Sequence, residues 1–189
     1  SLVLVKGART FAFERIIYRL QEKVHSTILE IDLNALTHNL NFYRSQISPA
    51  TKMMVMVKAY AYGSGSTEVA ALLQHHRIDY LAVAYPDEGV ALRHNGITLP
   101  IMVMNAEPDS YDVMIRFQLE PEIYSFRTLQ NWIEANSHYS HTDTDIPPIH
   151  LKIDTGMHRL GFIDSDLSLL KKTIVEHPVI RIASIFTHL

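Results

Sequence analysis

The sequence has no cysteine, no long apolar run and no strong excess of charge of either sign. Without cysteine it can form neither disulfides nor thiolate metal sites, which suits a reducing compartment, so we expect a cytoplasmic protein. No segment reaches the roughly 18 apolar residues of a membrane span, and the first apolar stretch is too short for a signal peptide. A formal net charge of −3 provides no basic surface for nucleic acid or membrane. We expect a soluble globular protein with neither partner.

The sequence also lacks a G-x-G-x-x-G motif after its first buried strand, which argues against a dinucleotide-binding fold. From residue 52 onward it alternates short apolar runs with longer amphipathic segments, as strand–helix units do. Near-continuous apolar strands are typical of a parallel sheet covered by helices. The predicted strands are 52–58, 80–85, 101–105, 120–125, 149–154 and 181–188.

This alternation predicts an α/β fold, specifically an incomplete (β/α)8 TIM barrel with about six of its eight strands. A closed barrel usually needs about 250 residues, more than the 189 present here. Because the sequence stops at "IFTHL", at the end of a predicted strand, we expect a truncated barrel over residues 26–189. Residues 1–25 differ in pattern and are expected to be a linker or the tail of a preceding domain. Asp32 is the predicted cap of the helix in "IDLNALTHNLN".

Lys58 lies in "VKAYAYGSG", where a predicted buried strand runs into a glycine-containing turn. Catalytic residues of barrels follow the carboxyl ends of strands, and desolvation lowers the pKa of a lysine toward that of a reactive amine. Schiff-base chemistry at Lys58 is one interpretation. A strand-end lysine that extends into solvent is the other. Tyr62 offers a phenol that could donate to an anion beside the backbone N–H groups of the turn.

A second candidate segment is "HLKIDTGMHRLGF", residues 150–162. Lys152 lies inside the predicted strand, where a buried ion pair with a nearby acid is the simplest interpretation, and Asp154 ends the strand. Arg159 follows a glycine turn, a suitable place for a guanidinium that meets a carboxylate or phenolate. The letters "DTG" also occur in aspartic proteases, but those enzymes use a carboxylate pair on an all-β fold, which the alternating pattern does not favour.

Histidines supply the remaining candidates. His188 ends the last predicted strand, where it could stack on an aromatic ligand, relay a proton, or simply be structural. The pairs His75/His76 and His138/His141 resemble metal ligands in spacing but have no carboxylate or thiolate beside them. We therefore predict no metal site.

Four segments taken together resemble alanine racemase, a pyridoxal-phosphate enzyme of the barrel type, also called fold type III. They are "VKAYAYGSG", "YLAVAYPDEGVALRHNGITLPIMVM", "HLKIDTGMHRLGF" and "IFTH", with "ILEIDLNALTHNLN" similar to the start of that family. The resemblance covers roughly residues 26 to 189. It implies pyridoxal 5'-phosphate as cofactor, alanine as substrate, and a homodimer in which a C-terminal β domain of the partner supplies the second catalytic base.

The resemblance also implies roles for individual residues. Lys58 matches the lysine that holds the cofactor through a Schiff base and acts as one of two catalytic bases. Lys152 matches a lysine that is often carbamylated and positions the arginine. His158 departs from the family, which usually has glycine at that position. The remaining matches are Tyr62 with the tyrosine that binds the cofactor phosphate, Arg159 with the arginine that contacts the phenolic oxygen and the substrate carboxylate, His188 with the histidine against the pyridine ring, and Met104 with an apolar residue of the same pocket.

The function implied is interconversion of L- and D-alanine for peptidoglycan precursor synthesis, with the truncated piece expected to be inactive alone. A small pyridoxal-phosphate-binding homeostasis protein of the same barrel type and a non-catalytic interaction module are the alternatives. The first residues, "LVLVKGARTFAFERIIYRL", resemble the end of a Mur ligase, the enzyme that adds D-alanyl-D-alanine to a UDP-muramoyl tripeptide. We therefore expect a fragment of a ligase–racemase fusion.

Overall fold

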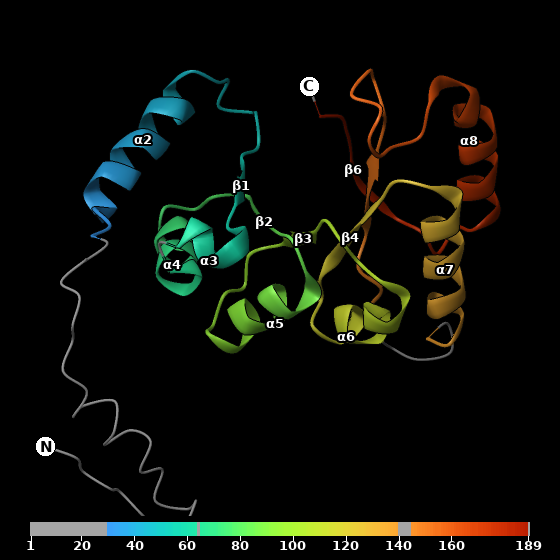
Figure 1. Ribbon diagram of the computed structural model, residues 1–189, viewed down its shortest axis with the longest axis horizontal. Coiled ribbons are helices and arrows are strands. Elements are labelled where there is room, and N and C mark those ends of the chain that lie inside the picture. The colour runs from blue at the N-terminus through green and yellow to red at the C-terminus, as the bar shows by residue number, and fades with distance from the viewer. Residues whose placement is uncertain (1–29, 64, 140–144, 189) are drawn as a thin grey trace, which may run out of the picture. The chain divides into compact units, whose positions relative to one another are not determined.

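The structure is a computed structural model that describes residues 30–63, 65–139 and 145–188. Residues from Asp32 onward form one compact unit, shown in Figure 1. The predicted ligase-like tail, residues 1–25, lies outside the described residues. The predicted cap is confirmed, because Asp32 Oδ1 accepts hydrogen bonds from the N–H groups of Asn34 (2.8 Å) and Ala35 (3.1 Å) at the start of helix α2, Leu33–Ser45.

Six parallel strands form one sheet in the order β1-β2-β3-β4-β5-β6, so each strand pairs with its neighbour in sequence. This order is that of a (β/α) barrel, and the described strands leave β1 and β6 as open edges. The predicted incomplete barrel with six strands is therefore confirmed. The strands are β1 (Met54–Met56), β2 (Tyr80–Val83), β3 (Ile101–Val103), β4 (Glu120–Ile123), β5 (Ile149–Lys152) and β6 (Ile182–Phe186).

Helices connect successive strands and lie along the outside of the curved sheet (Figure 1). Pairing of consecutive parallel strands requires such crossovers. None of the described helices is both long and apolar enough to cross a membrane. The helices are the turn α3 (Lys58–Tyr62), α4 (Ser66–His75), α5 (Pro86–His94), α6 (Tyr111–Arg116), α7 (Phe126–Ser137) and α8 (Leu167–Glu176), with short 3-10 turns η2 (Pro108–Ser110) and η3 (Asp164–Asp166).

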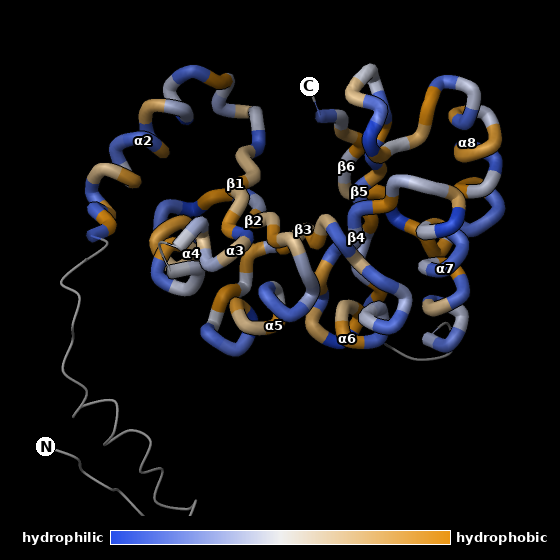
Figure 2. Tube along the Cα trace, in the orientation of Figure 1, coloured by the Kyte–Doolittle hydropathy of each residue, from blue (hydrophilic) through white to orange (hydrophobic). Residues whose placement is uncertain are grey.

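The core lies between the sheet and these helices. Strands β2 and β3 are largely hydrophobic (Figure 2). Leu81 and Ile101, one in each strand, are fully buried. Trp132 of α7 is also fully buried and contacts the ring of Tyr111 edge to face, with centroids 5.0 Å apart. Helix α6 shows only weak periodicity in the sequence, yet Tyr111, Met114 and Ile115 fill the space beneath it. This packed layer gives the loops at the strand ends a rigid support.

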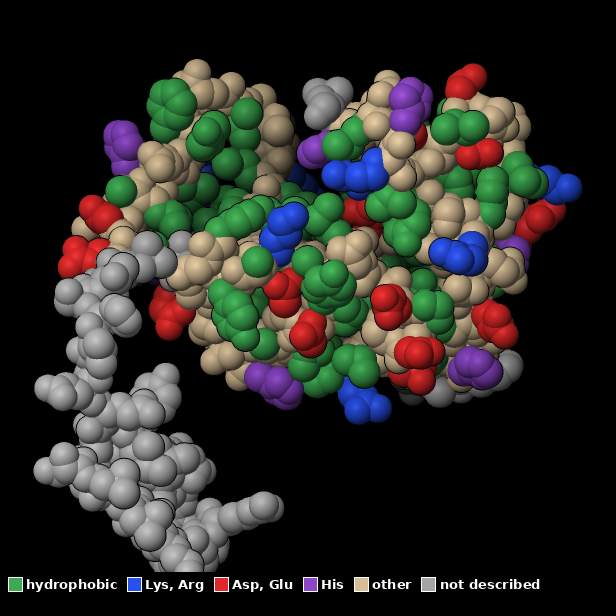
Figure 3. All heavy atoms as spheres, viewed as in Figure 1, with side chains coloured by type: hydrophobic (Ala, Val, Ile, Leu, Met, Phe, Trp, Pro, Cys, Tyr) green, Lys and Arg blue, Asp and Glu red, His purple; other side chains and the backbone are tan. Residues whose placement is uncertain are grey.

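The face drawn in Figure 3 carries exposed hydrophobic side chains between the charged ones. On edge strand β6, Ile182 and Ile185 are 40% and 64% exposed. Together with Leu151, Leu170 and side chains of α8, they line an apolar groove of about 390 Å³. The side chains of inner strands β2, β3 and β4 are almost all buried.

Candidate active site at the carboxyl ends of the strands

Most of the predicted site residues lie at one edge of the sheet. Lys58 follows β1, Met104 follows β3, Arg159 lies in the loop after β5, and His188 follows β6. Because all six strands are parallel, their carboxyl ends meet at the same edge, which is where barrel enzymes place their chemistry. Lys58 and Met104 are half-buried, whereas Arg159 and His188 are exposed. Within the described residues, no hydrogen bond or ion pair joins these side chains directly.

Tyr62 lies on the turn that begins at Lys58 and is 69% exposed. This turn has an unusual backbone, since Ala59, Tyr60, Ala61 and Tyr62 all have φ between 51° and 58°, in the left-handed region. Left-handed geometry costs an L-residue about 1–2 kcal/mol, and a run of such residues persists only where the surroundings impose it. The run ends at Gly63, with φ of 92°.

Glu88, in the first turn of α5, holds this strained turn in place. One carboxylate oxygen accepts a 2.6 Å hydrogen bond from the Ala59 N–H, the residue directly after Lys58. The other accepts from the N–H groups of Ala84 (2.7 Å) and Tyr85 (3.1 Å) at the end of β2. One carboxylate thus ties the Lys58 turn to the neighbouring strand.

The Lys58 side chain itself has no hydrogen-bond or ion-pair partner within the described residues. A half-buried amine at a strand end, next to a backbone held under strain, is available for a ligand rather than committed to the fold. A cleft of about 270 Å³ lies beside the same turn and is lined by Tyr60, Ser66, Tyr85, Asp87, Glu88 and Ala91.

The loop that carries Arg159 is shaped by Asp154. Its Oδ1 accepts hydrogen bonds from the N–H groups of Gly156 and His158, both at 3.0 Å. These two backbone hydrogen bonds, with smaller help from the His158 ring, lower the pKa of Asp154 below its ordinary value. His158 has φ of 56°, a left-handed conformation that glycine adopts more readily. His158 therefore adopts a backbone conformation that favours glycine, and the turn still forms.

The loop after β5 is also joined to the loop after β6. Thr155 Oγ1 and Thr187 Oγ1 lie 2.6 Å apart, and the Ile153 N–H donates to the Phe186 carbonyl at 2.9 Å. His188 directly follows Thr187 in the sequence. These contacts bring the Arg159 loop and the segment before His188 together.

Gly161 allows the Arg159 loop to pass close to the strand end. Its φ is 132°, and a Cβ there would lie 2.5 Å from the Asp154 nitrogen. We expect Gly161→Ala to lower the free energy of unfolding by about 1–3 kcal/mol more than Gly156→Ala, through overpacking. Gly156 is the matched control because its φ of 138° is similar, but a Cβ there would meet nothing within 4 Å. Equal losses of stability in urea unfolding would contradict the close approach.

Below the loops, two buried pairs join β4 and β5. Lys152 Nζ donates to Glu122 Oε1 at 3.0 Å, with side chains only 4% and 1% exposed. His150 Nε2 lies 2.8 Å from Glu120 Oε2, and His150 Nδ1 lies 2.7 Å from Ser184 Oγ. The simplest interpretation of Lys152 from the sequence, a buried ion pair, is thus what the structure contains.

Sequence reasoning missed Glu88 and Glu122. Glu88 stands three residues after Tyr85 at a helix start, the spacing of a capping box, but that pattern does not predict its bond to Ala59. Glu122 could have been noticed, because Glu120 and Glu122 alternate within an otherwise apolar strand and must find partners when buried.

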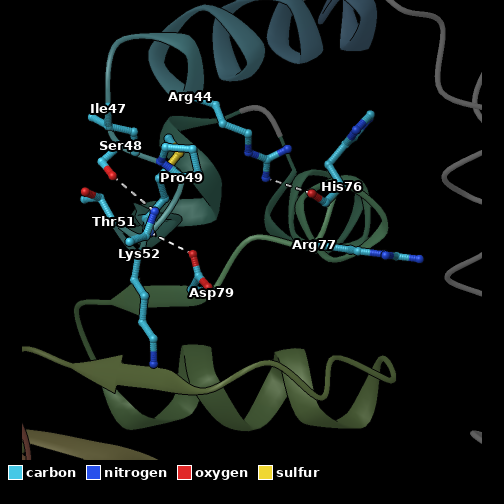
Figure 4. Close-up of a pocket in the computed structure, with 11 residues that line it drawn as sticks. Arg44, Ile47, Ser48, Pro49, Thr51, Lys52, His76, Arg77 and Asp79 are labelled. Carbon is cyan, nitrogen blue, oxygen red and sulfur yellow. Dashed lines mark hydrogen bonds between the residues drawn. The ribbon is translucent and has the colours of Figure 1, made fainter.

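A cavity of about 660 Å³ lies away from this edge, at the amino ends of β1 and β2. Arg44 is already engaged there, donating to the His76 carbonyl at 2.8 Å. Lys52 and Arg77 point away from one another in Figure 4 and do not converge on a common point. Barrel enzymes place their active sites at the opposite face, at the carboxyl ends of the strands. The described part of the chain contains no cluster of three or more His, Cys, Asp or Glu side chains that could hold a metal ion.

Comparison with known proteins identifies the family of the chain. Residues 31–189 match the model of the alanine racemase N-terminal domain. The chain is 39% identical over 163 residues to an amino-acid racemase of Enterococcus faecalis, covering 85% of this chain and 22% of that protein. It is 34% identical to an alanine racemase of Synechocystis, covering 85% of this chain and 43% of the relative.

Solved structures of alanine racemases share this fold. An alanine racemase of Clostridium difficile 630 in complex with cycloserine superposes with a TM-score of 0.77 at 33% identity, covering 89% of this chain and 46% of that one. The chain thus spans less than half the length of these relatives. Because the family model matches residues 31–189, most of the chain, the chain belongs to the family of alanine racemase N-terminal domains.

Proposed function

We propose that the chain is the cofactor-binding part of a pyridoxal-phosphate-dependent racemase that interconverts L- and D-alanine and thereby supplies D-alanine for peptidoglycan precursors. The observation that carries the proposal is Lys58, half-buried and unpartnered within the described residues, on a strained turn at the carboxyl end of β1. The names of the relatives support the reaction class, amino-acid or alanine racemase.

The residues present fit pyridoxal phosphate. Lys58 would hold its aldehyde carbon covalently through Nζ, Tyr62 would donate to the phosphate, and Arg159 would face the phenolic oxygen. Met104 and His188 would pack against the ring. When bound, the cofactor acts as an electron sink that makes the Cα proton of an amino acid acidic.

In this proposal Arg159 binds the substrate carboxylate, and Lys58 Nζ removes or returns the Cα proton on one face. Inversion needs a second base on the opposite face. The relatives extend well beyond the length matched here, and we propose that this base comes from a β domain of a partner subunit in a homodimer. The chain alone would then bind the cofactor without racemising alanine.

The test is to trap the cofactor on the purified chain. Pyridoxal 5'-phosphate is added, the carbon–nitrogen double bond is reduced with borohydride, and the label is located by peptide mass mapping. We expect the label on Lys58 and not on Lys52, which lies at the other end of the same strand. A label spread evenly over the lysines would refute the site.

Two alternative functions give different outcomes in the same system. A non-catalytic interaction module would show no specific label. A cofactor-homeostasis protein would be labelled at Lys58 but would not racemise alanine when joined to the β domain of a relative.

Glu88 provides a further prediction. We expect Glu88→Ala to weaken cofactor attachment at Lys58 by roughly 10-fold, because three backbone N–H groups lose a charged acceptor and the turn is released. Spectroscopic titration with pyridoxal 5'-phosphate measures the change. Asp87→Ala is the matched control, since Asp87 lies in the same helical turn without these bonds. Equal affinities of the two variants would show that the turn does not depend on Glu88.

A further inference from the structure

Strand β6 contains one residue more than the stretch of β5 with which it pairs. The Ile149 N–H donates to the Arg181 carbonyl at 2.8 Å, and the Ile153 N–H donates to the Phe186 carbonyl at 2.9 Å. An advance of four residues along β5 therefore corresponds to five residues along β6. The extra residue makes a β-bulge, a feature that is rare between parallel strands.

The bulge lies at Ala183. Ile149 pairs with Ile182, but the next residue of β5, His150, pairs with Ser184. Bulges are common next to active sites, where they redirect side chains. The bulge of β6 lies just before the strand end that carries part of the candidate site.

The bulge decides which side chains of β6 face which way. Side chains of a regular strand alternate between two faces, yet Ile182 and Ile185, three residues apart, line the same apolar groove. Ser184 and Phe186 lie on the other face, where the Phe186 ring is 5.5 Å from Lys152 Nζ. Without the extra residue, Ile185 would take the place of Phe186 beside Lys152.

A buried hydrogen bond holds the residue that follows the bulge. His150 Nδ1 lies 2.7 Å from Ser184 Oγ, and His150 Nε2 lies 2.8 Å from Glu120 Oε2 on β4. The His150 side chain is 1% exposed, and its ring contacts that of Tyr80 on β2 edge to face, with centroids 5.5 Å apart. Because β4 and β2 hold the ring, Nδ1 is a fixed partner for Ser184. A hydroxyl can donate or accept, so this hydrogen bond persists in either protonation state of the imidazole.

The residues after the bulge are joined to the loop that carries Arg159. Thr187 Oγ1 lies 2.6 Å from Thr155 Oγ1 in that loop, and His188 follows Thr187 directly. A slip of one residue in β6 would move Thr187 by about 3.3 Å, the rise per residue of a strand. A hydrogen bond does not tolerate a shift of that size, so the link between the two loops depends on the bulge.

We propose that His150 and Ser184 are positioning residues whose hydrogen bond holds the bulge of β6. The bulge in turn sets the register that brings Thr187, and after it His188, to the loop of Arg159. The effect on the cofactor rests on the proposed function, whereas the register of β6 does not.

The first experiment measures the register without cofactor. The chain has no cysteine, so the double variant Thr155→Cys/Thr187→Cys introduces a single pair, whose sulfurs can bond in the observed register. We expect a disulfide to form in this variant. Adding Ser184→Ala should slow its formation by about 3-fold to 10-fold, the effect of losing one hydrogen bond.

Two further variants control this measurement. Ser184→Thr keeps the hydroxyl and should restore the rate. Ile185→Ala alters the next residue of the same strand, which is 64% exposed on the other face, and should leave the rate unchanged. Failure of the cysteine pair to form a disulfide, or equal rates with Ser184→Ala and Ile185→Ala, would overturn the proposal, whether or not pyridoxal phosphate binds.

The second experiment tests the consequence for the site. We expect Ser184→Ala to weaken pyridoxal 5'-phosphate binding by about 3-fold to 10-fold, with Ser184→Thr and Ile185→Ala close to wild type. Thermal unfolding sets a temperature at which all variants are folded. Wild-type affinity in Ser184→Ala, or no rescue by Ser184→Thr, would contradict the positioning role. Absence of binding by the wild type would instead refute the proposed function, and the disulfide would still test the register.

Discussion

Replacing Lys58 by alanine is expected to abolish covalent attachment of pyridoxal 5'-phosphate and to lower racemase activity of the complete enzyme by more than about 100-fold. The amine is both the point of attachment and the proposed base on one face of the substrate. Because Lys58 has no partner within the described residues, its removal leaves no buried charge behind. Stability should therefore change little, and the defect should appear in the absorption spectrum and in turnover.

Lys52→Ala is the control for this experiment. Lys52 lies just before the same strand, at its amino end beside the 660 Å³ cavity. We expect it to retain the cofactor spectrum and the activity of the wild type. If Lys58→Ala kept a wild-type spectrum that resists dialysis, the amine at this strand end would not be the attachment point, and the proposed function would fail.

The second large effect concerns stability. We expect Lys152→Met to lower the free energy of unfolding by about 3–5 kcal/mol, because it leaves Glu122 buried without its counter-charge. The double variant Lys152→Met/Glu122→Met should recover most of that loss, since an apolar pair of similar size replaces a buried ion pair at little cost. Urea unfolding of the four members of the cycle gives the coupling directly.

The pH dependence of Lys152→Met follows from the same pair. Burial raises the pKa of Glu122 above its ordinary value near 4.5, and the loss of Lys152 raises it further. A carboxyl group with a raised folded pKa lowers stability once the pH exceeds its unfolded pKa, because the unfolded chain then releases a proton that the folded chain retains. The stability defect should thus be smallest below the unfolded pKa, grow as pH rises from the unfolded pKa to the folded pKa, and stay constant above the folded pKa.

Lys172→Met serves as the control for the cycle. Lys172 is 70% exposed and lies 3.8 Å from Glu176 on the surface of α8, where ion pairs contribute little. We expect no measurable change in its unfolding. If Lys172→Met lowered the free energy of unfolding as much as Lys152→Met, burial of the ion pair would not explain the effect of Lys152→Met.

The sequence predicted the strands because their apolar runs and the helical periodicity between them are local properties. All six predicted strands are present, although each is shorter than its apolar run. The run at 52–58 ends at Met56, because the chain then enters the left-handed turn that begins after Lys58. Helix α6 shows the least regular helical pattern in the sequence, since its buried residues follow the shape of the core rather than a regular stripe.

By itself, the sequence determined the parallel α/β architecture and the placement of Lys58 and His188 at strand ends, because strand direction alone brings carboxyl ends to one edge. Only the tertiary structure decided which acid meets which base. The pairing of Lys152 with Glu122, 30 residues apart, depends on strand register, and the bond from Glu88 to Ala59 depends on the close approach of two loops. Such contacts follow from packing across the fold, which no local pattern encodes.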